Sequence, residues 1–304
     1  MWTKIEFAGE YSFKGGVLED RDLSGIACVS PTRGLIGADE SGAVQVVELF
    51  RTDRSLRVLR TVALVSANQE LDIEAIASEG AFYYIVGSHG VAKKSGSMQI
   101  SRYRIFRLQV DPTTGMPVNA GNALAVAGLS RLLEADPTLG RYFARPLQQQ
   151  GVNIEGLAAR NGRLFIGLRN PNLDGHAFVV EVSARDVFAG GSPPAHRLHT
   201  LNLGRGLGIR EIVAARSGFL IIAGNAGSEP SKKHPRAKDY SKDRGFWMFT
   251  WDGKGPAVHK VGRIPNAPGK AEAMTILEES ADEGTVLILF DGAPKGRPSV
   301  YRIR

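Results

Sequence analysis

The chain has 304 residues, of which 43% are hydrophobic and 23% charged, so its composition is that of a folded globular protein. No stretch approaches the roughly 18 to 20 apolar residues of a membrane span, so we expect no membrane segment. The net charge of +7, from 38 basic and 31 acidic residues, favours a small anionic partner. Nucleic acid is disfavoured because no stacking aromatic residues are interleaved with the lysines.

One short pattern recurs five times and is predicted to begin a strand each time, at Leu23–Ala27, Ile73–Ala77, Ile154–Ala158, Arg210–Ala214 and Ala271–Thr275. A second, apolar pattern follows each copy after a turn, at Leu35–Asp39, Tyr83–Ser88, Leu164–Arg169, Leu220–Asn225 and Val286–Asp291. Three copies separate their two polar residues by 14 positions, for instance Glu74 and Ser88. The regular spacing predicts an internal structural repeat.

Each repeat continues with two further segments in which apolar and polar residues alternate, as in half-buried strands. Examples are Ala177–Val182 and Val258–Ile264. Four antiparallel strands per repeat make a propeller blade, so the sequence predicts an all-β, five-bladed β-propeller. The fifth repeat ends after three strands, and we expect the leading segment Thr3–Phe7 to supply its fourth strand and close the ring.

We expect one propeller domain over residues 1–304, with an insertion at 128–150 between the second and third blades. Leu129–Glu134 and Arg141–Phe143 suggest short helical pieces there, which Pro137 and Pro146 interrupt. A degenerate sixth blade in this region is the alternative interpretation.

The first strand of every propeller blade lines the axis, so the polar residues of the first pattern are expected to meet there. They are Ser24, Glu74, Glu155, Glu211 and Glu272. Several carboxylates this close together repel one another unless a cation or arginines neutralise them. An all-oxygen set suits Ca²⁺, which is the cofactor that we predict. The open alternative is that the glutamates pair with basic side chains or backbone N–H groups and tie the blades together.

The second pattern ends at the same face of the ring, and its last residues are candidates for contacting a substrate. With the histidine beside them they are Asp39, His89, Arg169, Asn225 and Asp291. Basic residues follow in the loops of this face, including Lys93, Lys94, Lys242 and Arg244. An acidic centre inside a basic rim is what a metal-bridged phosphate ester needs.

The segments Asn153–Ala158, Gly167–Pro171 and Gly206–Glu211 make the chain resemble a bacterial family known as domain of unknown function 3616. That resemblance implies a propeller fold and no biochemistry. The ring of glutamates and a serine is more distantly similar to calcium-activated apyrases, and phytase-like propellers are a second analogy. The apyrase resemblance implies Ca²⁺ ligands at the five first-pattern residues and hydrolysis of nucleotides.

Two functions follow as expectations. One is a Ca²⁺-dependent hydrolase of phosphate esters or nucleotides, and the other is a non-catalytic propeller that binds a ligand or protein and has a structural glutamate ring. The start of the sequence, Met1–Glu6, has no apolar stretch with a cleavage site, so a cytoplasmic location is expected, or a periplasmic one if a leader was removed.

Overall fold

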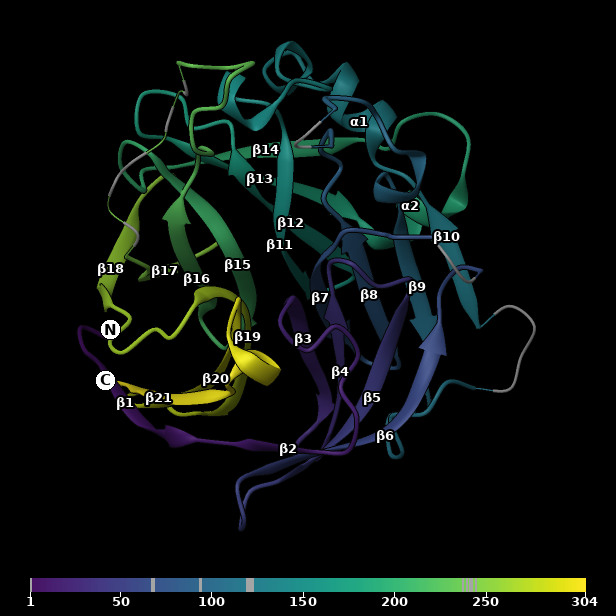
Figure 1. Ribbon diagram of the computed structural model, residues 1–304, viewed down its shortest axis with the longest axis vertical. Helices are drawn as coiled ribbons and strands as arrows, with labels where there is room; N and C mark the ends of the chain where they lie inside the picture. Colours follow the sequence, from purple (N-terminus) through teal and green to yellow (C-terminus); the bar gives the residue numbers. More distant parts are fainter. Residues whose placement is uncertain are drawn as a thin grey trace.

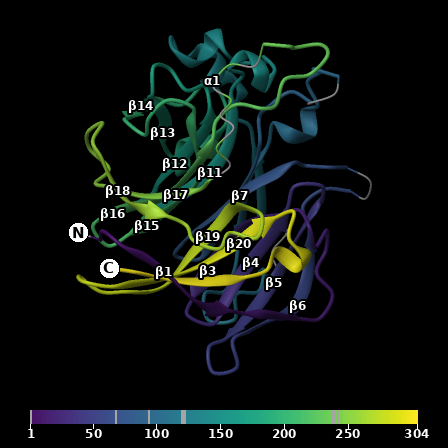
Figure 2. The ribbon, with the colours of Figure 1, turned by 60° about the vertical axis from the view of Figure 1, so that its left-hand side comes forward.

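A computed structural model shows five mainly antiparallel sheets arranged as a ring around a central axis (Figure 1). It describes residues 2–66, 69–92, 95–118, 123–236, 238, 240, 243 and 245–304. Each sheet is one blade, so the five-bladed propeller predicted from the repeat is confirmed. Figure 2 shows the ring turned, with the two chain termini beside each other at the blade that contains β1.

The strands of each blade are numbered along the chain. Blade one consists of β3 (Leu23–Ser30), β4 (Arg33–Ala38), β5 (Ala43–Phe50), β6 (Ser55–Ala63) and the short β2 (Ser12–Lys14). Blade two consists of β7 (Ile73–Glu79), β8 (Phe82–Gly87), β9 (Ile105–Gln109) and β10 (Leu124–Ala127). Blade three consists of β11 (Asn153–Arg160), β12 (Arg163–Asn170), β13 (Ala177–Ser183) and β14 (His196–Leu201). Blade four consists of β15 (Leu207–Ala215), β16 (Gly218–Asn225), β17 (Trp247–Trp251) and β18 (Val258–Arg263).

Blade five closes the ring with strands from both ends of the sequence. It consists of β19 (Lys270–Glu279), β20 (Gly284–Asp291), β21 (Ser299–Ile303) and β1 (Ile5–Glu10). The pairing of β1 with β21 is antiparallel and places Ile5 opposite Ile303, so the predicted closure is confirmed. The strand β2, which pairs in parallel with β6, was not expected from the sequence.

The hydrophobic core is divided into five clusters, and each cluster lies between two neighbouring blades. The alternation of apolar residues along the strands explains this, because both faces of a blade contact another blade. The blades converge at the axis, and the inner strands carry small residues there. A Cβ added at Gly25 would lie 2.7 Å from Ile76 Cγ1 of the next blade.

The insertion between blades two and three contains helical turns and no strand in its described residues. The turns are α1 (Ser130–Ala135) and the 3₁₀ segments η2 (Leu139–Arg141) and η3 (Leu147–Gln149). Leu132, Leu133 and Leu139 are buried in the cluster shared by these two blades. The segment therefore covers the blade junction and does not form a sixth blade.

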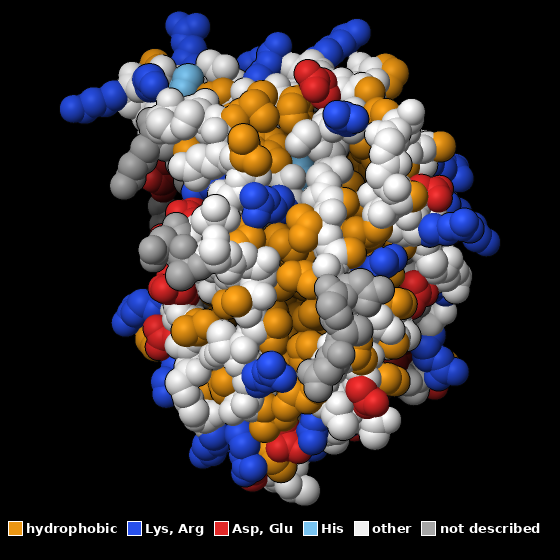
Figure 3. All heavy atoms as spheres, turned by 90° about the vertical axis from the view of Figure 1, so that its right-hand side faces the viewer, with side chains coloured by type: hydrophobic (Ala, Val, Ile, Leu, Met, Phe, Trp, Pro, Cys, Tyr) orange, Lys and Arg blue, Asp and Glu red, His pale blue; other side chains and the backbone are white. Residues whose placement is uncertain are grey.

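Three other short helical segments lie in connections: η1 (Ile100–Arg102), α2 (Ala184–Ala189) and η4 (Pro294–Gly296). Among the described residues, no helix has the length and apolar character needed to cross a membrane. The face on which β10 lies carries a band of hydrophobic side chains between charged ones (Figure 3). Val126 of β10 is 53% exposed.

Candidate functional site

The inner strand of every blade contains a register irregularity close to its start. In β7, Ile73 pairs with Gly87 and Ala75 pairs with Val86, so Glu74 is left out of the pairing. The corresponding residues in the five blades are Ser24, Glu74, Glu155, Arg210 and Glu272. Four of these five were expected at the axis. In blade four the position belongs to Arg210 and not to Glu211.

Arg210 supplies a positive charge to the ring. Its Nε lies 2.8 Å from Glu155 Oε2 in blade three, and its Nη2 contacts Glu272 Oε1 in blade five. All three residues are buried, with at most 6% of their surface exposed. Burial lowers the pKa of Arg210 to about 10, so the guanidinium is charged at neutral pH. One arginine thus joins three consecutive blades electrostatically.

Arg169 extends this network outward from the ring. It lies at the end of β12, and its Nη1 donates to Glu155 Oε1 at 2.8 Å. Its Nε and Nη2 donate to the carbonyl oxygens of Ala226 and Gly227, at 3.0 and 2.9 Å. Arg169 was expected to contact a substrate. The structure shows it connecting blade three to the loop between β16 and β17 of blade four.

Glu211 lies one residue further along β15 and has a different environment. Its Oε1 accepts hydrogen bonds from the backbone N–H groups of Leu157 at 3.3 Å and Ile212 at 2.8 Å. Its Oε2 is buried without a hydrogen-bond partner in the described structure. Burial raises the pKa of Glu211 well above its usual value, although these N–H groups and that of Met274 oppose the shift. Glu211 therefore interacts with backbone groups of blades three, four and five.

The residue spacing could not reveal this shift in blade four. Compared with the other blades, the two positions of blade four lie one residue earlier than expected. They are Arg210 and Gly224 in place of Glu211 and Asn225, so the separation of 14 is preserved. Gly224 provides space, because a Cβ there would lie 3.1 Å from Arg210 Cγ. Aligning the apolar residue before each polar one, such as Ile73 with Ile209, would have identified Arg210.

His89 is fully buried between blade two and the insertion. Its Nδ1 lies 2.9 Å from the carbonyl oxygen of Gly87, and its Nε2 accepts a hydrogen bond from the Leu129 N–H at 3.2 Å. Burial lowers its pKa to about 4, which agrees with a neutral ring that uses one nitrogen as donor and the other as acceptor. This arrangement leaves no atom of His89 for the substrate contact that we expected.

The remaining expected contacts lie at the ends of other second strands. Asp291 at the end of β20 is 8% exposed and pairs with Lys270 of β19. Asn225 is the last residue of β16, and Asp39 follows the end of β4. Of the expected basic rim, Lys93, Lys94, Lys242 and Arg244 lie outside the described residues.

A small polar pocket opens between blades two and three, next to the ring. It brings together three residues predicted from the repeat, Glu74, Ser88 and Arg169. Sequence reasoning missed Arg102, Arg145 and Asn153, which also line it. Arg102 pairs with Asp72 at 3.2 Å and also with Glu70. The pocket volume is about 20 Å³, enough for about one water molecule.

The ring side chains do not fit a shared Ca²⁺ in this arrangement. Arg210 contacts carboxylate oxygens of both Glu155 and Glu272, and the Ser24 hydroxyl donates to the carbonyl oxygen of Ile73. In the part of the chain that the structure describes, the group of three acidic side chains whose oxygens lie within 4.8 Å of one another is away from the ring and exposed or partly exposed. They are Glu19, Asp22 and Glu40. The central Ca²⁺ stays a prediction, and no step of a mechanism is derived through it.

Solved structures resemble the chain at low sequence identity. One is "YCF48 bound to D1 peptide", with 12% identity and a TM-score of 0.38, covering 95% of this chain and 63% of that one. A luciferin-regenerating enzyme has 8% identity and a TM-score of 0.40, covering 98% and 94%. Virginiamycin B lyase from Staphylococcus aureus has 9% identity and a TM-score of 0.39, covering 99% and 98%. These likenesses carry no argument about activity.

Sequence comparison with protein families gives a clearer result. No curated protein matches the chain. A family model described as "Protein of unknown function (DUF3616)" matches residues 22–110 and 119–301. The match includes the inner strands β3, β7, β11, β15 and β19, and therefore the whole ring. The chain, a five-bladed propeller, therefore belongs to this family, whose description leaves its function open.

Proposed function

We propose that this protein is a non-catalytic binding propeller in which the charged ring is structural and the adjacent pocket takes a small anion. The observation that carries the proposal is the placement of Arg210 between Glu155 and Glu272. Because the ring contains its own buried cation, it does not need a metal to offset the repulsion between these two carboxylates. The chemistry available to a ligand is then that of the pocket between blades two and three.

The pocket offers donors suited to a carboxylate or a phosphate. Arg145, from the insertion, is exposed, and its guanidinium lies 5.8 Å from the Tyr142 ring centroid. Arginine presents a planar fork of N–H donors that matches both kinds of anion. Ser88 adds a hydroxyl group. Asn153 is 6% exposed, and its Oδ1 is buried without a partner, so its amide can turn to present Nδ2 to a ligand.

The size of the pocket determines what binding requires. A volume of about 20 Å³ does not hold a phosphate group, so the exposed Arg145 side chain must move outward to admit one. Such a rotamer change is common at binding sites and leaves the backbone in place. Glu74, on the ring side of the pocket, disfavours highly charged anions. We therefore expect a singly or doubly charged ligand held mainly by Arg145.

Thermal unfolding with added anions tests this proposal. Inorganic phosphate and acetate would be compared with chloride at equal ionic strength, for the wild type, Arg145→Ala and Arg141→Ala. Arg141 is an exposed arginine of the same insertion that does not line the pocket, so it is the matched control. A specific ligand at 100 times its Kd stabilises the fold by about 2.7 kcal/mol. We expect this gain in the wild type and in Arg141→Ala, and its loss in Arg145→Ala.

Two outcomes would contradict the proposal. The first is an equal effect of phosphate, acetate and chloride, which would mean that the pocket has no anion specificity. The second is Ca²⁺-dependent turnover of nitrophenyl phosphate or a nucleotide that EDTA abolishes. That result would make the protein a metal-dependent hydrolase, and loss of turnover in Glu155→Gln would then assign the ion to the ring.

A further inference from the structure

A second pocket lies at the opposite end of the blades from the ring, between blades four and five. It is formed by the turns after β15 and β19, by the turn between β17 and β18, and by the N-terminal segment before β1. Its volume is about 790 Å³. Small-molecule sites in proteins commonly enclose roughly 300 to 1,000 Å³. The pocket is therefore large enough for an organic ligand, in contrast to the polar pocket beside the ring.

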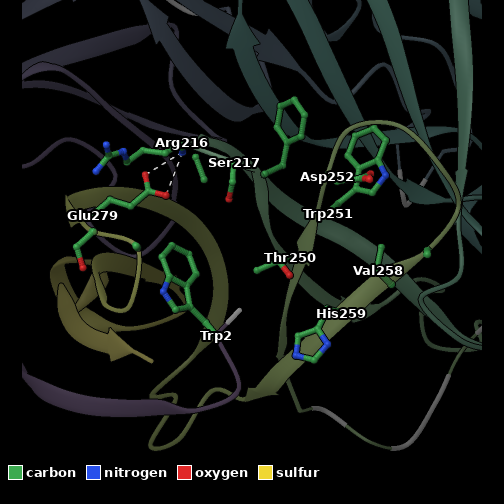
Figure 4. A pocket seen from close by; sticks show the side chains of 14 residues that line it. Trp2, Arg216, Ser217, Thr250, Trp251, Asp252, Val258, His259 and Glu279 are labelled. Carbon is green, nitrogen blue, oxygen red and sulfur yellow. Dashed lines mark hydrogen bonds between the residues drawn. The ribbon is translucent and has the colours of Figure 1, made fainter.

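Aromatic rings form much of the wall of this pocket. Trp2 lies on one side, and Trp251 lies on the other (Figure 4). Phe219 stacks on Trp251 with a centroid distance of 5.2 Å and an interplanar angle of 28°. All three side chains are buried to more than 90%, so their positions are fixed by packing. Rigid aromatic walls favour a ligand that has an apolar or aromatic body.

Two carboxylates, those of Glu279 and Asp252, also line the pocket. Both oxygens of Glu279 accept from the backbone N–H of Arg216, at 3.0 Å each, and Asp252 Oδ1 accepts from the Lys254 N–H at 2.9 Å. Within the described chain, these two carboxylates thus accept hydrogen bonds from backbone groups and not from cationic side chains. The guanidinium of Arg216 extends away from Thr250 and Trp251 (Figure 4).

A buried nitrogen without a partner gives a further, independent indication of a ligand. His259 of β18 lines the pocket, and its Nε2 is buried with no hydrogen-bond partner among the described residues. A buried polar atom without a partner is uncommon in folded proteins, and a ligand or water usually explains it. With the proton on Nδ1, this nitrogen would accept a hydrogen bond from an ammonium group.

We propose that the pocket between blades four and five binds a small organic cation that carries an ammonium group on an aromatic or aliphatic body. The exposed parts of the indole and phenyl rings provide an apolar wall for the body of the ligand. Glu279 and Asp252 add negative potential, and His259 Nε2 accepts from the ammonium. An anion of the same shape meets two carboxylates and is disfavoured. This site is distinct from the anion pocket and does not depend on it.

Three probes with the same phenyl body and different charge test the proposal: phenethylammonium, 2-phenylethanol and phenylacetate. Binding would be followed by calorimetry and by tryptophan fluorescence. We expect phenethylammonium to bind most tightly and phenylacetate least tightly. The double variant Asp252→Asn, Glu279→Gln keeps the side-chain shapes and removes both charges, and we expect it to weaken phenethylammonium by about tenfold while 2-phenylethanol is unchanged. Asp282→Asn removes an exposed carboxylate of the β19–β20 turn that does not line the pocket, and is the matched control.

Ser217→Trp provides a steric test, because Ser217 is exposed on the turn that forms one wall and the larger side chain fills the pocket. Circular dichroism would confirm that each variant is folded. If the double variant Asp252→Asn, Glu279→Gln does not fold, the conservative single variant Asp252→Asn takes its place. Binding of phenylacetate as tight as that of phenethylammonium would overturn the proposal. So would millimolar phenethylammonium that fails to bind the wild type, or that binds Ser217→Trp equally well.

Discussion

Replacing Arg210 by methionine removes the cation of the ring and keeps a side chain of similar length. Glu272 then loses its buried counter-ion, while Glu155 keeps Arg169 at 2.8 Å. Removing one partner of a buried ion pair costs about 3 to 5 kcal/mol, because it leaves a buried charge uncompensated. For a chain of this size each kcal/mol lowers Tm by roughly 2 °C, so we expect a fall of roughly 6 to 10 °C.

Differential scanning calorimetry at neutral pH measures this change directly, and Arg297→Met is the matched control. Arg297 pairs with Glu10 at 2.9 Å, but its side chain is 54% exposed. An exposed pair contributes about 0 to 1 kcal/mol, so this variant should unfold close to the wild type. The double variant Arg210→Met, Glu272→Gln should recover much of the loss, because it removes the uncompensated charge together with its partner.

The reasoning is refuted if Arg210→Met unfolds within the small shift of Arg297→Met. A second contrary result would be a Ca²⁺-dependent rise in the Tm of the wild type that disappears in Glu155→Ala, since it would show that the ring carboxylates remain open to an ion. A large loss of stability without recovery in the double variant would assign the effect to lost packing by the Arg210 stem and not to charge.

Three further predictions concern individual buried residues. Burial raises the pKa of Glu211, so its carboxyl is neutral in both the folded and the unfolded state well below its ordinary pKa of 4.5. Stability is lost as the pH rises from there toward the folded-state pKa. Glu211→Gln should therefore unfold at a higher temperature than the wild type at neutral pH, and calorimetry between pH 4 and 8 should show the difference narrowing toward acid. The pKa of His89 is lowered from 6.5 to about 4, so the unfolded chain takes up the proton first, and stability should fall by about 3 kcal/mol as the pH drops across that window. His89→Gln should flatten this acid slope in urea unfolding curves, and an unchanged slope would contradict the assignment. Gly224→Ala should lower the free energy of unfolding by about 1 to 3 kcal/mol, because the added Cβ would lie 2.8 Å from Phe246 Cε1 and 3.1 Å from Arg210 Cγ. Gly80→Ala is the control: an added Cβ there meets nothing within 4 Å, so the cost should be only the backbone strain at φ +59°, about 1 kcal/mol.

The five-bladed architecture could be predicted from the sequence because the same strand pattern recurs in every blade. Each blade buries both faces, so its strands keep a periodicity that survives differences in loop length. The unpaired leading strand was predicted by counting the strands of the last repeat, and β1 occupies that place. The short strand β2 was missed because three residues carry too little periodicity to be recognised.

Only the tertiary structure decided which side chains meet at the axis and what neutralises them. A bulge moves one residue of each inner strand out of the strand pairing. In blade four, two adjacent polar residues, Arg210 and Glu211, were candidates for that position. Spacing cannot separate them, because side-chain direction reverses at every residue of a strand while the distance between motifs stays the same. Burial and ion pairing at the converging inner strands place Arg210 between two glutamates, and those contacts join segments far apart in the sequence.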